Sequence, residues 1–206
     1  KKPRLDLNRA IERQLITRTP MPPKTPVFRA VSVQEPSAAF SGTLFSVERN
    51  GKEEIYGVVA THSISSEPGD PFGLQRRFVA VVYDQGKPVA MQAKIVAASP
   101  VSMLDIALVK FPNDKKALLN PYRLANAQQN DKLHSLGFNR DGMVTVNGRE
   151  VLTQFPASLR TTMPLERPRR PGLCGGAVLN EREELVGIHT GSRQGTPFKP
   201  ECAYAT

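Results

Sequence analysis

Short apolar stretches alternate with turn-forming residues along most of the chain. Turn residues at Asn50-Gly51 and in the segment 84–87 favour tight hairpins between the strands that flank them. Stretches rich in valine, isoleucine and phenylalanine are typical of β-strands. In the first half they predict strands over residues 42–47, 55–60, 78–83, 89–96 and 106–111.

A second series of strands follows a polar segment near residues 112–130. Turns are expected within it at Asp141-Gly142 and Asn147-Gly148. Two groups of about six short strands without interior helices predict an all-β fold of two packed antiparallel six-stranded β-barrels, because closing a sheet removes its unpaired edges. The second group is predicted to cover residues 133–138, 143–146, 151–155, 177–179 and 185–189.

The residues before the first strands have a different character. Apolar residues recur at helical spacing within the segment 5–16. Four prolines among residues 19–27 then end the helix and favour an extended linker. We therefore expect the following domains: a basic N-terminal arm with a short helix and a proline-rich linker over 1–27, an N-terminal barrel over 28–115, a linker over 116–128 and a C-terminal barrel over 129–206.

Composition is typical of a folded, strand-rich chain. Hydrophobic residues make up 39% of the 206 positions, and 18 prolines and 15 glycines are scattered without a period, which favours many turns. No apolar stretch approaches ~18 residues, so no membrane span is expected. No basic-then-apolar leader opens the chain, and the sequence leaves both secretion and a host-cell cytoplasmic location possible.

The formal charge of +9 is concentrated near the start of the chain. Residues 1–30 hold eight lysines or arginines against Asp6 and Glu12, a net charge of +6. Such an arm either contacts nucleic acid or an anionic membrane surface, or lies in solvent as a charged tail. The tail is the favoured interpretation, because single-strand binders interleave aromatic rings with cations and this segment offers only Phe28.

Three residues next to strands are candidates for a reactive site. His62 follows an apolar strand, and Asp105 directly precedes another, where a carboxylate must be either exposed or paired. Cys174 lies in the glycine-rich turn Gly-Leu-Cys-Gly-Gly, where backbone N–H groups can converge to hold an oxyanion. The first two residues belong to one half and the third to the other, which predicts a site between the barrels.

Each of these residues also has a structural interpretation. A histidine after a strand is usually structural, an aspartate before one is often a turn residue, and cysteine is among the most frequently buried side chains. His134, within an apolar strand, is interpreted as structural, and Cys202 as a buried thiol. The separated histidines and cysteines lack the spacing of zinc ligands, so we expect no metal and no cofactor.

Taken together, the motifs resemble those of the chymotrypsin-like proteases over roughly residues 28–206. Val-Ala-Thr-His62 is similar to the family's Thr-Ala-Ala-His box, and Asp105-Ile-Ala-Leu to its Asp-Ile-Ala-Leu box. Gly172-Leu-Cys174-Gly-Gly resembles the Gly-Asp-Ser-Gly-Gly nucleophile motif. The cysteine and the later Gly-Ile-His189 resemble the cysteine-type processing proteases of picornaviruses, and Gly-Ile-His also resembles bacterial glutamyl endopeptidases, which use serine.

The resemblance implies an endopeptidase that acts on polypeptides. Cys174 would be the nucleophile, His62 its general base, and Asp105 the group that orients the imidazole. The backbone N–H groups of Gly172 and Cys174 would receive the oxyanion. If Cys174 is a replacement for a native serine, the same resemblance implies a serine-type enzyme.

The resemblance also implies a specificity pocket lined by His189. A histidine here selects Glu or Gln before the scissile bond, because its N–H can donate to a side-chain oxygen. Arg169 and Arg170 stand where the picornaviral relatives tend to place a small hydroxyl residue. If either guanidinium faces the pocket it favours a carboxylate, so Glu is ranked slightly above Gln.

Two other functions are compatible with the sequence. The first is a protease-like barrel that binds peptides without cleaving them, which the intact histidine, aspartate and thiol disfavour. The second is nucleic-acid recognition through the basic arm, beside proteolysis or instead of it. The near absence of aromatic residues in that arm disfavours it.

Overall fold

The computed structural model describes residues 25–33, 39–64, 78–99, 104–128, 131–139, 142–155, 158–162, 172–193 and 202–205. For the strand residues within 144–162 and 191–205 it describes the backbone alone. The helix expected in the N-terminal arm lies outside the described residues, as do Arg169 and Arg170. In the part of the chain that is described, no helix is long and apolar enough to cross a membrane.

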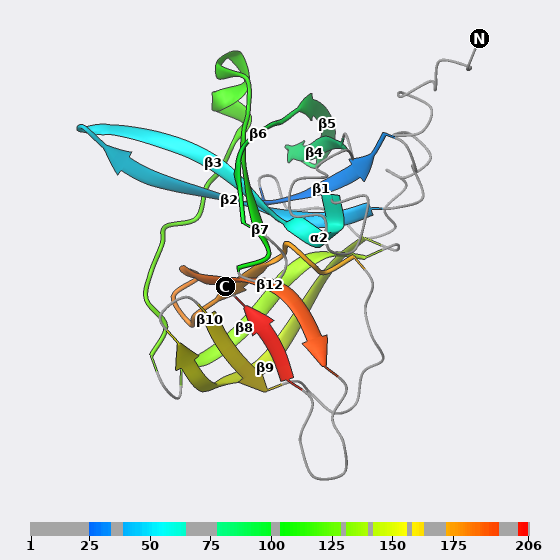
Figure 1. Ribbon diagram of the computed structural model, residues 1–206. Coiled ribbons are helices and arrows are strands. Elements are labelled where there is room, and N and C mark those ends of the chain that lie inside the picture. Colours follow the sequence, from blue (N-terminus) through cyan, green and yellow to red (C-terminus); the bar gives the residue numbers. More distant parts are fainter. Residues whose placement is uncertain are drawn as a thin grey trace.

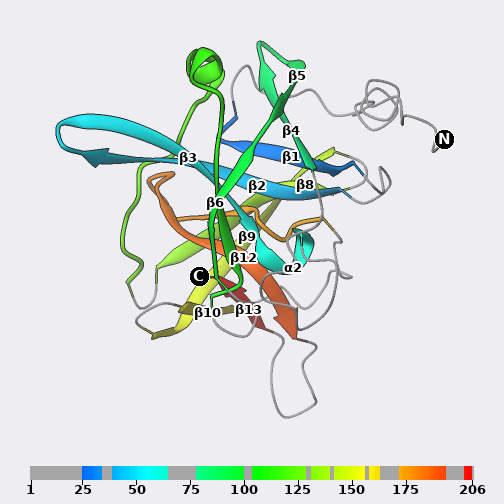
Figure 2. The same ribbon diagram turned by 45° about the horizontal axis from the view of Figure 1, so that its top comes forward.

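The first barrel is closed by a bent strand. β5 pairs with β4, β6 pairs with β7, and only Ala93 separates β5 from β6, so one kinked strand joins the two edges of the sheet (Figure 2). This gives the six-stranded plan that the sequence predicts. The strands are β1 (Val27–Ser32), β2 (Ala39–Arg49), β3 (Lys52–Ala60), β4 (Phe78–Asp84), β5 (Lys87–Gln92), β6 (Lys94–Ala98) and β7 (Ile106–Lys110).

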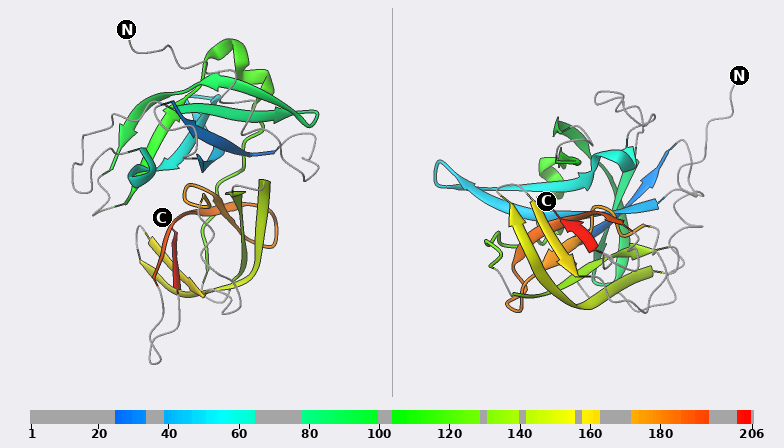
Figure 3. Two further views of the ribbon diagram at one scale, coloured as in Figure 1. Left: turned by 90° about the vertical axis from the view of Figure 1, so that its right-hand side faces the viewer. Right: turned by 60° about the horizontal axis from the view of Figure 1, so that its bottom comes forward.

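The second barrel has six antiparallel strands and lies below the first (Figures 1 and 3). Its strands are joined in the closed order β10-β13-β12-β11-β8-β9. The connection from the first barrel contains the 3-10 helix η1 (Asn113–Leu118). The strands are β8 (Lys132–Asn139), β9 (Gly142–Phe155), β10 (Ser158–Thr162), β11 (Ala177–Leu179), β12 (Leu185–Arg193) and β13 (Cys202–Ala205). The predicted all-β fold of two barrels is confirmed.

Two predicted hairpin turns are confirmed by their backbone dihedrals. Asn50 and Gly51 join β2 to β3 with φ of 53° and 69°, and Gln85 and Gly86 join β4 to β5 with φ of 49° and 76°. Positive φ at both central residues is the conformation that matches the twist of two paired strands. The β2–β3 hairpin projects well beyond the barrel (Figure 1).

The predicted turn at Asn147-Gly148 is wrong, because β9 runs through it without a break. Leu133 pairs with Arg149 and Ser135 with Val146, so the Asn-Gly pair lies opposite one residue of β8. Two residues facing one is a β-bulge, which bends a strand and increases its twist. An Asn-Gly pair therefore forms a tight turn between β2 and β3 but a β-bulge within β9.

Strand β1, which the sequence pattern did not predict, is buried on both faces. One face lies in the interior of the first barrel, and the other packs against the second barrel. Tyr83 stacks on Phe138 at 5.8 Å between ring centroids, which adds to the contact between the barrels. The inner face of β1 packs with Leu44, Val59 and Val109, and the outer face belongs to a cluster with Phe138, Leu179 and Ile188.

Replacement of Phe28 tests the central position of β1. Its side chain is fully buried and meets Phe111 edge to face at 5.5 Å between ring centroids. Phe28→Ala should lower the free energy of unfolding by about 3–5 kcal/mol, because it removes apolar burial and leaves a cavity. Urea unfolding measures the loss. As a control, Val96→Ala at a 45% exposed position should change stability by less than about 0.5 kcal/mol.

Candidate active site

Two paired strands bring His62 and Asp105 to the same end of the first barrel. Ala60 of β3 pairs with Ile106 of β7. His62 lies in the single-turn helix α2 (Thr61–Ile64), directly after β3, and Asp105 directly precedes β7. His62 Nδ1 lies 2.6 Å from Asp105 Oδ2, and the His62 backbone N–H donates to Asp105 Oδ1 at 2.9 Å. Because a carboxylate only accepts, Nδ1 carries the proton and Nε2 is left for another partner.

Local backbone contacts hold Asp105 in this position. Asp105 has a φ of 54°, in the left-handed region that aspartate tolerates better than most residues. Its carbonyl oxygen accepts the Thr61 N–H at 3.0 Å, and the Thr61 hydroxyl donates to Ser99 O at 2.8 Å. These bonds join the segment before β7 to α2. The carboxylate and the imidazole therefore keep one relative orientation.

Cys174 approaches this pair from the second barrel. It lies in the turn before β11, is a free thiol and is half-buried. Its side chain hydrogen-bonds the His62 ring. The turn lies directly on β2: a Cβ atom at Gly175 would be 2.0 Å from Ser41 O, and the φ of Gly175 is 87°. Only glycine fits such a backbone approach.

Two side chains of β2 bind the turn that carries Cys174. The Ser41 hydroxyl donates to Gly172 O at 2.7 Å, and the Ser41 backbone N–H donates to Cys174 O at 3.1 Å. The Thr43 hydroxyl donates to Gly175 O at 2.9 Å. Both side chains are fully buried. Sequence reasoning missed these two residues, although small polar residues inside an apolar strand are a signal for such contacts.

The remaining backbone groups of the turn have complementary roles. Leu173 O accepts the Gly176 N–H at 2.8 Å, so every carbonyl oxygen from Gly172 to Gly175 accepts a hydrogen bond. Within the described residues, the N–H groups of Gly172, Leu173 and Cys174 have no protein acceptor. The turn thus uses its acceptors within the protein and leaves donors next to the thiol, as an oxyanion site requires.

The pKa of His62 is raised to about 10. The hydrogen bond with Asp105 is the main cause, the hydrogen bond with Cys174 is the second, and burial of the ring opposes both. The imidazole is therefore protonated at neutral pH.

His189, the residue expected in a specificity pocket, is buried on β12 next to the nucleophile turn. Its backbone N–H donates to Gly176 O at 2.9 Å, and its carbonyl accepts the Gly175 N–H at 2.8 Å. It lies inside the strand rather than at the strand end predicted from the sequence, because β12 continues to Arg193. The other proposed pocket residue, Arg169, lies outside the described residues.

The third histidine has a different partner. His134 Nε2 lies 3.2 Å from Glu183 Oε1, a contact within the second barrel. This contact agrees with the structural interpretation of His134. No disulfide joins Cys174 to Cys202, whose side chain lies outside the described part of the structure.

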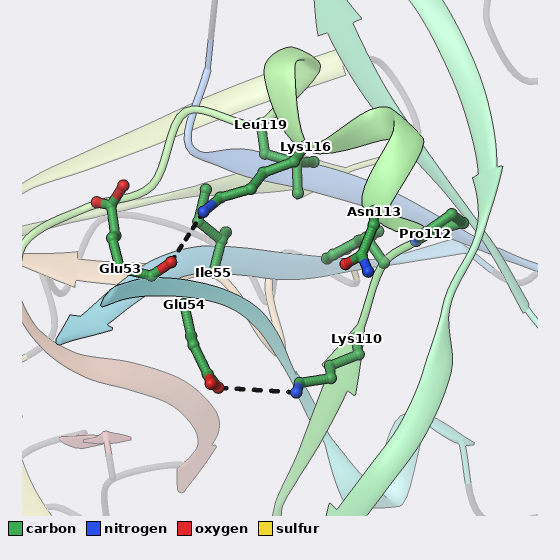
Figure 4. Close-up of a pocket in the computed structure, with 9 residues that line it drawn as sticks. Glu53, Glu54, Ile55, Lys110, Pro112, Asn113, Lys116 and Leu119 are labelled. Carbon is green, nitrogen blue, oxygen red and sulfur yellow. Dashed lines mark hydrogen bonds and ion pairs between the residues drawn. The ribbon is translucent and has the colours of Figure 1, made fainter. Parts of the chain in front are cut away.

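A pocket of about 290 Å³ lies at the other end of β3 from His62 (Figure 4). Lys116 Nζ donates to Glu53 O at 2.8 Å there, and Lys110 Nζ lies 3.7 Å from a Glu54 carboxylate oxygen. The lysines thus have partners on β3. None of the three candidate catalytic residues lines this pocket.

Comparisons with known proteins bear on the fold. No family model matches the chain. Protease Do-like 5, chloroplastic, of Arabidopsis thaliana is 25% identical over 171 residues, which cover 73% of this chain and 52% of that protein. The chain therefore spans about half the length of this curated relative.

Two solved structures are similar over most of the chain. The MamO protease domain from Magnetospirillum magneticum in its apo form has a TM-score of 0.58 at 17% identity, covering 91% of this chain and 93% of that one. The serine protease of a human pathogenic astrovirus has a TM-score of 0.55 at 12% identity, covering 88% of each chain. These similarities show that the chain has the chymotrypsin-like double-barrel fold.

The raised pKa of His62 predicts how stability depends on pH. A group with a higher pKa in the folded state stabilises the fold fully below its unfolded value of 6.5, and this contribution is lost as the pH rises towards about 10. Between these values the chain should lose stability relative to His62→Gln. Urea unfolding of both proteins at several pH values measures the difference. Parallel curves would contradict the raised pKa.

Proposed function

We propose that the chain is an endopeptidase with Cys174 as nucleophile, His62 as the group that carries the proton and Asp105 as the group that orients His62. One observation carries the proposal: a single imidazole hydrogen-bonds a carboxylate on one side and a thiol from the other barrel on its second side. Such an arrangement activates a nucleophile. The fold, and the protease names of the similar proteins, support it.

The chemistry begins from an ion pair. Because the pKa of His62 is raised to about 10, the imidazole carries a proton at neutral pH, and in the proposed mechanism Cys174 reacts as its thiolate. The thiolate attacks the scissile carbonyl carbon, a C–S bond forms, and the C=O electron pair moves to the oxygen. The N–H groups of Gly172 and Cys174 receive this oxyanion.

Collapse of this intermediate releases the first product. The C–N bond breaks, and His62 gives its proton to the leaving amine, which leaves a thioester on Cys174. Water then attacks the thioester while His62 takes up a proton from it, and the thiolate is released. Throughout, Asp105 holds the imidazole with its Nε2 edge available to the reacting groups.

Substitution of the proposed pair tests this function. Cys174→Ala and His62→Ala should each lower peptide cleavage by about 1000-fold or more while the protein still folds, since removing one member of such a unit removes most of its catalysis. Asp105→Ala should have a smaller effect, because a thiol ionises more readily than a hydroxyl. Initial rates on a peptide library measure all three.

The matched control is His134→Ala, which removes a histidine that is paired with Glu183. It should cleave like the unmodified chain. Wild-type activity in either Cys174→Ala or His62→Ala would exclude the proposed pair. If the unmodified chain binds peptides but cleaves none, the chain is a protease-like binding module.

We further propose that the enzyme prefers Glu or Gln immediately before the scissile bond. The support is the position of His189, buried on β12 and bonded through its backbone to Gly175 and Gly176. An imidazole N–H near the nucleophile can donate to a side-chain oxygen of the substrate. Arg169 or Arg170, if one faces the same pocket, adds a charge-assisted bond that favours Glu.

Matched peptides that differ only at this position test the preference. Glu or Gln should be favoured over Lys, Arg, Phe and Ala by at least about tenfold, because a site built to hydrogen-bond a side chain rejects those that cannot. His189→Ala should remove most of this preference while cleavage continues. A profile dominated by basic or aromatic residues would exclude the pocket and leave the catalytic proposal intact.

A further inference from the structure

We propose that Ser41 is a positioning residue for the oxyanion site, acting from the first barrel on the backbone of the second. Its buried hydroxyl holds one of the two peptide groups that separate the N–H donors of Gly172 and Cys174. This inference rests on the proposed function, since it assigns the oxyanion to those two donors.

The Ser41 hydroxyl makes two short hydrogen bonds to the second barrel. Its Oγ accepts the Phe138 N–H at 2.7 Å and lies 2.7 Å from Gly172 O. Phe138 O is also near, at 3.4 Å. The single hydroxyl proton is therefore donated to the nearer acceptor, Gly172 O. Because Ser41 is 0% exposed, bulk water does not compete for either bond.

Gly172 and Cys174 are separated by two peptide groups, and among the described residues each group is held by one hydrogen bond. The group between Gly172 and Leu173 is held through Gly172 O by the Ser41 hydroxyl. The group between Leu173 and Cys174 contains the Cys174 N–H itself and is held through Leu173 O by the Gly176 N–H. The distance and angle between the two donors depend on both groups, because a peptide group is planar and rotates as a unit.

The surroundings of Ser41 leave little room for other arrangements. A Cβ atom at Gly137 would lie 2.8 Å from Ser41 Oγ and 2.7 Å from a methyl carbon of Leu173. Gly137, on the facing strand β8, therefore has no room for a side chain beside Ser41 and Leu173. This packing fixes the hydroxyl between Phe138 and Gly172, so it acts as a spacer as well as a donor.

Loss of the hydroxyl should affect one step of the chemistry and leave another unchanged. Without it, the peptide group after Gly172 loses the hydrogen bond from Ser41 and can rotate, which displaces one oxyanion donor relative to the other. A displacement of about 1 Å in a reacting site can cost about 100-fold in rate. The described contacts of Ser41 do not include the Cys174 thiol or the His62 ring, so thiolate formation should be unaffected.

Two reactions of the same thiol separate these effects. With p-nitrophenyl acetate, the thiolate attacks the ester carbonyl, an oxyanion forms, and p-nitrophenolate leaves as a thioester is made. With iodoacetamide, the thiolate displaces iodide from a saturated carbon and no oxyanion forms. The experiment measures both rate constants, with peptide mapping to restrict the alkylation rate to Cys174.

Ser41→Ala should lower the rate of acylation by about 10- to 100-fold, less than or equal to the effect of deleting one oxyanion donor. The rate of alkylation, and its dependence on pH, should remain within about twofold of the unmodified chain. Ser135→Ala is the matched control, because Ser135 is also a fully buried serine but its hydroxyl has no hydrogen-bond partner in the described part of the structure. Both of its rates should be unchanged.

Ser41→Cys makes the same test if Ser41→Ala does not fold, since a thiol fills the space but donates weakly. Equal changes in both rates, or none in either, would overturn the proposal for Ser41, as would an unmodified chain that iodoacetamide alkylates but p-nitrophenyl acetate does not acylate. A different result would exclude the proposed protease function. A chain that reacts with both reagents and cleaves no library peptide would exclude proteolysis, while the ratio of the two rates would still decide the role of Ser41.

Discussion

The contact between the turn that carries Cys174 and strand β2 is the constraint on which the site depends. The thiol and the imidazole belong to different barrels, so their hydrogen bond exists only if the barrels keep one relative position. Gly175 allows the turn to approach Ser41 so closely that a side chain there would collide with its backbone oxygen at 2.0 Å. Hydrogen bonds from Ser41 and Thr43 to the turn fix the position of the turn along β2. A slide of one barrel along the other would break them together.

The two barrels contribute different chemistry. The first supplies titratable groups, because β3 and β7 end side by side and α2 turns His62 back onto Asp105. The second supplies a thiol and a row of backbone donors whose carbonyl groups are already bonded. His62 joins the two halves of the site, because its ring hydrogen-bonds the Asp105 carboxylate and the thiol from the second barrel. In the proposed mechanism the imidazole carries the proton and Asp105 orients it.

The same local sequence has different outcomes where the tertiary context differs. Asn50-Gly51 forms the tight turn that its residues predict, since nothing else competes for the end of the β2–β3 hairpin. Asn147-Gly148 instead forms a bulge, because β9 must continue past it to pair with β10 and close the second barrel. Strand β1 lacks the alternation of a half-buried strand, since both of its faces are covered.

The sequence by itself determined most of the strands, the two-barrel plan and the identity of His62, Asp105 and Cys174 as candidates, because strand periodicity, turn residues and reactive side chains are local properties. The tertiary structure decided the rest. Ser41 and Gly172 are separated by 131 positions. No local sequence pattern predicts that the Ser41 hydroxyl donates to the Gly172 carbonyl oxygen. The N–H groups that stay available near the thiol are those that no neighbouring carbonyl oxygen accepts, and this depends on the hydrogen-bond partner of every carbonyl group around the turn. Hydrogen-bond partners of this kind are chosen by the packing of the barrels, and packing is a property of the whole chain.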